Sequence, residues 1–176
     1  AMALRVAAPG PDGSAYELTL TRRVAKADQA PPRRSFLSPT MAGAAADLAA
    51  GRSVEPFWRA VVALGTPLVE PGPDDGQRVV TFVQRGAKRN VRLFGAPSGD
   101  HDWMERLGGT DIWFKSFVVP SATRMSYMLA PDVPELPGTR RQRRVALLAT
   151  ARADPLNRHP WPPRAPDPFN QRSTLT

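Results

Sequence analysis

The stretch RLGGTDIWFKSFVVP, residues 106–120, decides what kind of fold this sequence encodes. A polar turn with two glycines runs directly into an aromatic and β-branched segment, which is typical of a tight corner followed by a β-strand. Gly108 and Gly109 permit backbone angles that other residues avoid. Thr110 or Asp111 can hold the turn through side-chain to backbone hydrogen bonds. The stretch therefore predicts a hairpin corner, with one wall of a pocket as the alternative.

The strand after this corner presents two large aromatic side chains. Trp113 and Phe114 are neighbours in sequence, so they point to opposite faces of the strand. One of them is expected to pack in the core, while the other is less constrained. The sequence does not decide whether the Trp113 side chain packs in the core or lines a cleft.

Further segments with alternating apolar residues flank this strand and predict a mostly β fold. Turn sequences such as PGPDDGQ and RGAKRN separate them. Several short strands at this spacing are typical of a β-sandwich. The expected strands are residues 66–70, 78–85, 91–94, 112–119 and 124–129.

Two or three short helices are expected at the periphery. Ser38 and Pro39 form a helix start before residues 41–50, and Ser53 starts a second helix that Gly65 ends. A third helix follows Thr139 over residues 140–152 and ends before Asp154 and Pro155. The expected apolar stripes are Phe57, Val61 and Leu64 on the second helix, and Val145, Leu148 and Ala149 on the third.

The chain divides into three parts. Residues 1–35 contain an alternating strand, Tyr16–Thr21, after the turn sequence PGPDG and before a polar linker at 25–34. We interpret this part as an N-terminal strand and linker, with the tail of a preceding module as one reading. Residues 36–157 form the main domain. The proline-rich residues 158–176 have the composition of an extended linker toward a further domain.

Composition limits the classes of partner. The 176 residues include 24 Lys and Arg against 16 Asp and Glu, which gives a net charge of +8 and favours an anionic partner. An arginine-rich, merely solvated surface is the alternative. The sequence has no cysteine and no apolar run long enough for a membrane span.

No catalytic constellation is recognisable, so we expect no catalytic residue and no metal site in this chain. The two histidines, His101 and His159, lack metal-ligand spacing, and there is no GxSxG elbow or phosphate-binding loop. A binding surface remains. Four arginines crowd the start of the third helix, where cations oppose the helix dipole, and this suggests a functional demand or a solvated face offset by Glu135. These arginines are Arg140, Arg141, Arg143 and Arg144.

With these residues considered together, the chain resembles the N-terminal domain of the enterochelin (enterobactin) esterases, bacterial enzymes that hydrolyse ferric catecholate siderophores. The similarity covers roughly residues 55–157, and the pairing of RLGGTDIW with a downstream DPLN is specific. The other matching stretches are FWRAVVALGTPLVE (57–70), VTFVQRG (80–86), NVRLFG (90–95) and RMSYML (124–129). Arg158 departs from the family, in which proline often follows DPLN, and the segment before Ser53 is unlike the usual start.

The resemblance implies a fold, a substrate and a partner domain. It implies an immunoglobulin-like, early-set β-sandwich that packs over an α/β-hydrolase domain of the same polypeptide and helps to form the substrate cleft. The hydrolase triad would lie outside this chain, so that any enzyme activity, a carboxylic-ester hydrolysis, belongs to the parent protein. The expected partners are a ferric catecholate siderophore and that hydrolase domain. No cofactor is expected, because the iron enters only as part of the substrate.

The resemblance also selects residues. Arg106, Trp113, Arg140, Arg141, Arg143 and Arg144 are the candidates for substrate binding, because guanidinium groups and aromatic faces suit catecholate rings. The remaining motif residues are expected to be structural. They are Gly65, Thr66, Phe82, Arg85, Gly109, Thr110, Asp111, Asp154, Pro155 and Asn157.

Other functions compete with this one. A carbohydrate-binding early-set module would need coplanar exposed aromatic side chains, and a dimerisation domain would pair a strand such as Tyr16–Thr21 across a two-fold axis. Nucleic-acid binding through RRQRR, residues 140–144, is not expected, because no nucleic-acid motif accompanies it. A cytoplasmic location is expected, or a periplasmic one if an export signal precedes this sequence.

Overall fold

The computed structural model describes residues 2–7, 15–20, 35–95, 97–99, 101–135 and 137–176. They fall into two compact units, residues 1–35 and 36–176. In the first unit, β1 (Met2–Ala7) pairs antiparallel with β2 (Ala15–Leu20). The strand expected at Tyr16–Thr21 is thus present, shifted by one residue. The expected turn at 9–13 and linker at 25–34 lie outside the described residues.

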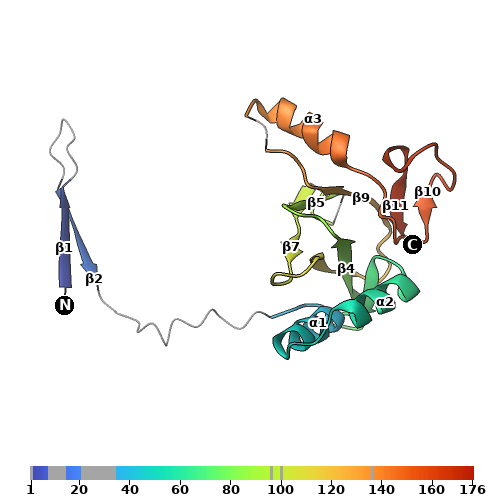
Figure 1. Cartoon of the computed structure of the whole chain (residues 1–176), viewed down its shortest axis with the longest axis horizontal. Helices are drawn as coiled ribbons and strands as arrows, with labels where there is room; N and C mark the ends of the chain where they lie inside the picture. The colour runs from blue at the N-terminus through green and yellow to red at the C-terminus, as the bar shows by residue number, and fades with distance from the viewer. Residues whose placement is uncertain (1, 8–14, 21–34, 96, 100, 136) are drawn as a thin grey trace. The chain divides into compact units, whose positions relative to one another are not determined.

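The second unit contains two antiparallel sheets and three helices, drawn in Figure 1. The first sheet has four strands in the order β3-β4-β8-β7. Its long central pair is β4 and β8, which place Gln84 opposite Trp113. The strands are β3 (Leu68–Pro71), β4 (Gln77–Arg85), β7 (Glu105–Arg106) and β8 (Ile112–Pro120).

The second sheet has five strands in the order β10-β11-β9-β5-β6. Its central strand, β9 (Met125–Pro131), pairs with β5 (Val91–Phe94) on one side and with β11 (Arg172–Leu175) on the other. The short strands β6 (His101–Trp103) and β10 (Pro160–Trp161) form the two edges. Mostly β structure is therefore confirmed, whereas the immunoglobulin-like, early-set arrangement stays a prediction.

The main core lies between the two sheets. Phe82 of β4 is fully buried and its ring packs edge-on against Tyr127 of β9, with centroids 4.7 Å apart. Trp113 of β8 belongs to the same cluster, so it faces the core. Leu175 of β11 closes the cluster at 9% exposure. Residues two apart on a strand share a face, and one face of each central strand supplies this layer. The intervening residues of β4 and β9 are buried as well, because helices cover the opposite faces of the two sheets.

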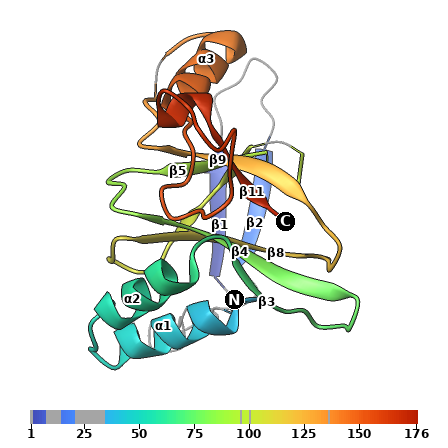
Figure 2. The same cartoon turned by 90° about the vertical axis from the view of Figure 1, so that its right-hand side faces the viewer.

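Two helices cover the other face of the four-stranded sheet, as Figure 2 shows. These are α1 (Pro39–Ala49), with Ser38 as its N-cap, and α2 (Glu55–Leu64). Phe114 packs against this helical layer and is 5% exposed. Both aromatic side chains that follow the corner, Trp113 and Phe114, are therefore buried. The stripe expected on α2 is wrong at its end. Leu64 is 67% exposed, because the chain turns away at Gly65, which has a φ of 82°.

The third helix, α3 (Arg140–Thr150), lies on the outer face of the five-stranded sheet (Figure 2). The stripe expected from Val145, Leu148 and Ala149 is wrong, since all three are exposed. Leu147 and Ala146 are buried instead, because the run VALLA is apolar on several faces and its periodicity is ambiguous. The helix also ends two residues before the expected Arg152, which forms a β-bridge with Leu129.

Residues 158–176 form part of the folded unit, so the prediction of an extended linker was wrong. Besides β10 and β11, the segment contains the 3₁₀ turn η2 (Pro168–Asn170). Ser173 and Leu175 are buried in alternation with the more exposed Arg172 and Thr174. Strand pairing of β11 with β9 explains this burial. Proline-rich composition up to residue 168 concealed a short and mostly polar strand after it.

Candidate ligand-binding pocket

Side-chain hydrogen bonds hold the turn that precedes β8. The Thr110 hydroxyl donates to the Leu107 carbonyl at 2.6 Å, and Arg106 Nε donates to the Thr110 carbonyl at 2.6 Å. The Arg106 guanidinium carbon lies 5.6 Å from the centre of the Trp113 ring. Trp113 itself is 7% exposed, and its Nε1 donates to the Ala87 carbonyl at 2.8 Å. Both residues therefore have structural partners here, and neither lines a described pocket.

Asp111 joins the corner to the helical layer. Its carboxylate accepts hydrogen bonds from Trp58 Nε1 and from Arg85 Nε, each at 2.8 Å. Arg85 also forms an ion pair with Glu55 at the start of α2. Partial burial by itself raises the pKa of Asp111, but the hydrogen bonds from Trp58 and Arg85 outweigh it, so that the pKa is lower than usual. These motif residues hold α2 onto the sheet.

The DPLN motif is built around a buried carboxylate. Asp154 accepts from the Thr66 hydroxyl at 2.6 Å and from the Tyr127 hydroxyl at 2.8 Å. Asn157 then links two chain segments, because its side-chain amide donates to the carbonyls of Thr66 and Thr174. Burial raises the pKa of Asp154 despite these hydrogen bonds. The motif therefore connects the end of α2, the centre of one sheet and β11, while Pro155 is exposed in the turn.

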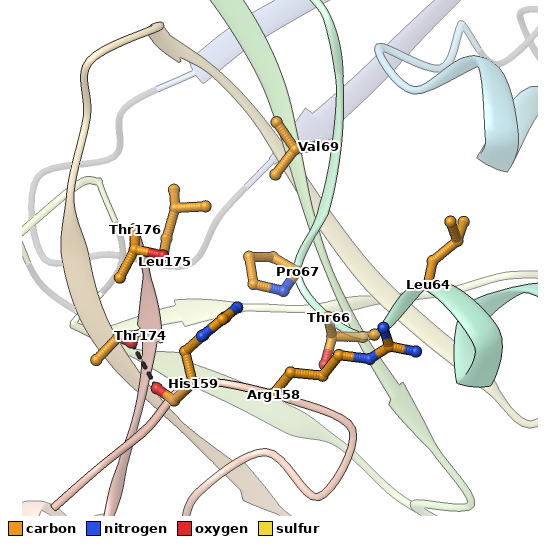
Figure 3. Close-up of a pocket in the computed structure, with 10 residues that line it drawn as sticks. Leu64, Thr66, Pro67, Val69, Arg158, His159, Thr174, Leu175 and Thr176 are labelled. Atoms are coloured by element: carbon orange, nitrogen blue, oxygen red, sulfur yellow. Dashed lines mark hydrogen bonds between the residues drawn. The ribbon is translucent and has the colours of Figure 1, made fainter. Parts of the chain in front are cut away.

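A small pocket of about 160 Å³ lies beside this motif, and Figure 3 shows its lining. The Arg158 guanidinium donates to the carbonyls of Val62 and Ala63 at the end of α2, and so it caps that helix. Glycine is favoured at position 65 because its φ of 82° is strained for other residues, and an added Cβ would also lie 3.0 Å from the flexible Arg158 side chain. The pocket is too small for a large ligand, and its arginine already has partners.

A second pocket of about 770 Å³ lies between α3 and the β5–β6 edge of the five-stranded sheet. One face of α3 forms its cationic wall, because residues 140, 143, 144 and 147 follow the i, i+3, i+4, i+7 spacing of a helix. Of the four α3 arginines predicted to bind substrate, three line this pocket and Arg141 does not. The lining residues are Arg92, His101, Trp103, Val133, Pro134, Glu135, Arg140, Arg143, Arg144 and Leu147.

The helix that carries these arginines begins with a capping box. The Thr139 hydroxyl accepts from the Gln142 backbone N–H at 3.3 Å, while the Gln142 side chain accepts from the Thr139 N–H at 2.8 Å. The first turn of α3 contains no acidic residue that would offset the repulsion between arginines and helix dipole. Capping thus stabilises a helix start that its charges disfavour.

The sheet wall of the pocket carries a stacked pair that the sequence reading missed. Arg92 of β5 lies opposite Trp103 of β6, and its guanidinium carbon is 3.7 Å from the ring centre. Arg92 Nη1 also donates to the His101 carbonyl at 3.0 Å. In VRLF, the alternation of Arg92 with buried neighbours was the available signal for an outward-facing cation. No such signal marked Trp103, because β6 has only three residues.

The pocket combines positive charge with an aromatic face. Four guanidinium groups and the Glu135 carboxylate line it, which leaves a formal surplus of three positive charges. Among the described residues, none of the ion pairs involves Arg140, Arg143 or Arg144. Trp103 keeps 49% of its surface exposed. Such an arrangement suits a large anion that contains flat rings.

This chain is similar in sequence to known enterobactin esterases. The family model for the N-terminal domain of enterochelin esterase matches residues 79–176, which include α3 and the segment 158–176. An iron(III) enterobactin esterase from Dickeya dadantii is 35% identical, with 59% of this chain and 29% of that protein covered. One from Yersinia enterocolitica is 34% identical, with 58% and 36% covered.

The solved structures that resemble this chain are also enterobactin esterases. The ferric enterobactin esterase of Salmonella typhimurium is 28% identical with a TM-score of 0.51, over 69% of this chain and 35% of that one. The enterobactin esterase of Shigella flexneri, solved in the presence of enterobactin, is 27% identical with a TM-score of 0.50, over 69% and 34%. The chain thus spans about a third of the length of these proteins. In the part of the chain that is described, no helix has the length and apolar character of a membrane span.

Proposed function

This chain belongs to the enterochelin esterase N-terminal family, and we propose that it binds a ferric catecholate siderophore on behalf of an esterase domain. The observation that carries the proposal is the pocket between α3 and the β5–β6 edge. It brings together three of the arginines that the sequence singled out and an exposed tryptophan.

Charge complementarity supports a ligand of this class. A ferric ion held by three doubly ionised catecholates carries about three negative charges, and such an anion is attracted to a positive, partly enclosed surface. Guanidinium groups also stack on flat rings and donate to oxygen ligands. The volume of about 770 Å³ falls within the range of pockets that bind small molecules.

In this proposal the domain covers the substrate while an α/β-hydrolase domain of the same parent protein hydrolyses the ester bonds. The relatives in which the match occurs are esterases, and the match covers only about a third of each. We expect the chain alone to bind the siderophore without turnover. A carbohydrate-binding function receives less support, because two of the four tryptophans, Trp58 and Trp113, are buried.

The first test is a titration of the chain with ferric enterobactin, followed by quenching of tryptophan fluorescence, with free catechol as the control ligand. We expect saturable quenching by the ferric complex. The double variant Arg143→Gln/Arg144→Gln should bind about tenfold or more weakly, because it removes two cations from the pocket wall.

The matched control for this test is Arg141→Gln, on the same helix but outside the pocket lining. It removes one cation from the same turn and should change the affinity by less than about twofold. If Arg141→Gln lost about half as much binding free energy as the double variant, in proportion to the charges removed, only the overall charge would matter. An absence of saturable binding would contradict the proposal for the chain by itself.

A further inference from the structure

We propose that Arg92, which lies over the Trp103 ring, is the residue by which this pocket selects aromatic anions over other anions of the same charge. The inference rests on the proposed function and assigns distinct tasks to the two walls of the pocket. The helix wall supplies charge, and the sheet wall supplies a flat surface that recognises rings.

The position of Arg92 is fixed by its place in β5 and by its contacts with Trp103 and His101. Arg92 and Trp103 are directly opposed in the antiparallel pair β5–β6, where side chains of opposed residues lie side by side. The guanidinium carbon lies 3.7 Å from the ring centre, and Nη1 donates to the His101 carbonyl at 3.0 Å. These two contacts orient the guanidinium plane before any ligand arrives.

The arginines of α3 are placed differently. Arg140, Arg143 and Arg144 are exposed, and in the described part of the chain no hydrogen bond or ion pair orients their guanidinium groups. Long, exposed cationic side chains attract any anion but impose little shape on it. The charge of the pocket can therefore draw in an anion without distinguishing its type.

On the same face of the sheet, beside the pocket and partly under α3, a second aromatic pair follows the stack. The next opposed pair on the same face is Phe94 with His101, whose ring centres are 6.4 Å apart. Arg172 of β11 lies 6.0 Å from the centre of the Phe94 ring. Within the pocket lining, the flat groups are those of Arg92, His101 and Trp103. A catecholate ring can stack on such groups, whereas a non-aromatic ligand gains charge attraction alone.

The test compares two ferric complexes that share the metal and a charge of about three negative units. Ferric enterobactin presents catecholate rings, while the ferric tris-oxalate complex presents none. Calorimetry measures both dissociation constants, so the readout does not depend on tryptophan. The quantity of interest is the ratio of the two constants in each variant, since differences in ligand size cancel between variants.

Arg92→Lys keeps the charge and removes the planar group. We expect it to weaken ferric enterobactin binding about tenfold and to change oxalate complex binding by less than about twofold. Trp103→Leu removes the support of the stack at an exposed position and should reduce the same ratio. Two controls on α3 separate the walls. Arg143→Lys should leave the ratio of the two constants unchanged, and Arg143→Gln should weaken both complexes alike.

The outcomes distinguish the inference from the proposed function. If the unsubstituted chain binds neither complex, the proposed function fails and the inference fails with it. If the unsubstituted chain binds ferric enterobactin but Arg92→Lys and Trp103→Leu leave the ratio unchanged, the function stands and the selective role of Arg92 is wrong. Thermal unfolding of each variant verifies that the fold is retained.

Discussion

Asp154 shows how a single residue connects distant parts of this chain. Its carboxylate accepts hydrogen bonds from Thr66, Tyr127 and the Leu156 backbone, and its own N–H donates to the Ser173 hydroxyl at 2.7 Å. Asp154 is buried, with 4% of its surface exposed. A buried carboxylate is costly when ionised unless hydrogen bonds offset the lost hydration, and here burial has the larger effect on the pKa.

This balance gives the stability of the protein a defined pH dependence. Because the pKa of Asp154 is raised in the folded state, its contribution is fully present below the unfolded value of about 3.8 and is lost as the pH rises through the folded value. Asp154→Asn removes this titration. The free energy of unfolding of the variant, relative to the parent, should therefore increase as the pH rises above about 4, by up to about 1.4 kcal/mol per pH unit.

Urea unfolding of both proteins from pH 3 to pH 7 measures this difference. A constant offset over the whole range would mean that Asp154 ionises at its ordinary pKa, and a decreasing one would mean that the pKa is lowered.

At the residue scale, the sequence marked unusual residue clusters better than it placed single side chains. It singled out Arg140, Arg143 and Arg144, which line the larger pocket, because clustered cations at a helix start are unusual in any fold. It could not decide between core and cleft for Trp113, because alternation assigns a strand two faces without saying what covers each. Trp103 went unrecognised as a pocket residue, since a strand of three residues has no readable period.

At the scale of elements, α3 depends on its N-terminal cap. Thr139→Ala removes the hydroxyl that accepts from the Gln142 N–H and should destabilise the helix start by about 1 kcal/mol. Arg140 and Arg143 lie in that first turn, so ferric siderophore affinity should fall with it. Hydrogen exchange of the α3 amides, compared with affinity, measures both effects.

Thr150→Ala is the matched control for this prediction. Thr150 lies at the opposite end of α3 and donates to the carbonyls of Ala146 and Leu147. Its substitution should leave exchange in the first turn and the affinity unchanged. Faster exchange in the first turn of both variants, or of neither, would contradict a specific role for the cap.

Elements whose ends carry a capping or stop residue could be predicted from the sequence, whereas elements defined only by tertiary contacts could not. The cap at Thr139 and the helix stop at Gly65 are local signals, and both are present in the structure. The buried side of α3 was assigned wrongly, because a run such as VALLA fits several helical faces until the sheet selects Leu147. Strand β11 was missed for the same reason, since only pairing with β9 makes its polar sequence a strand.

At the scale of the whole molecule, residues 158–176 complete the second sheet and contribute to the main core. Leu175→Ala should lower the free energy of unfolding by about 2–4 kcal/mol, because it removes a buried side chain from the cluster between the sheets. Phe169→Ala, in the same segment but 52% exposed, should cost less than about 1 kcal/mol. Urea unfolding of the two variants makes the comparison. Similar small losses in both would restore the interpretation of this segment as a linker.

The place of β11 beside β9 also determines when the domain can fold during its synthesis. The ribosome makes β9 first, then α3 and the proline-rich segment, and only afterwards the strand that pairs with the free side of β9. Until Leu175 emerges, the core between the sheets stays open along that side and exposes the apolar surface around Tyr127 and Leu129. The core of this domain can therefore close only after β11 has been synthesised, and until then its exposed apolar surface favours aggregation.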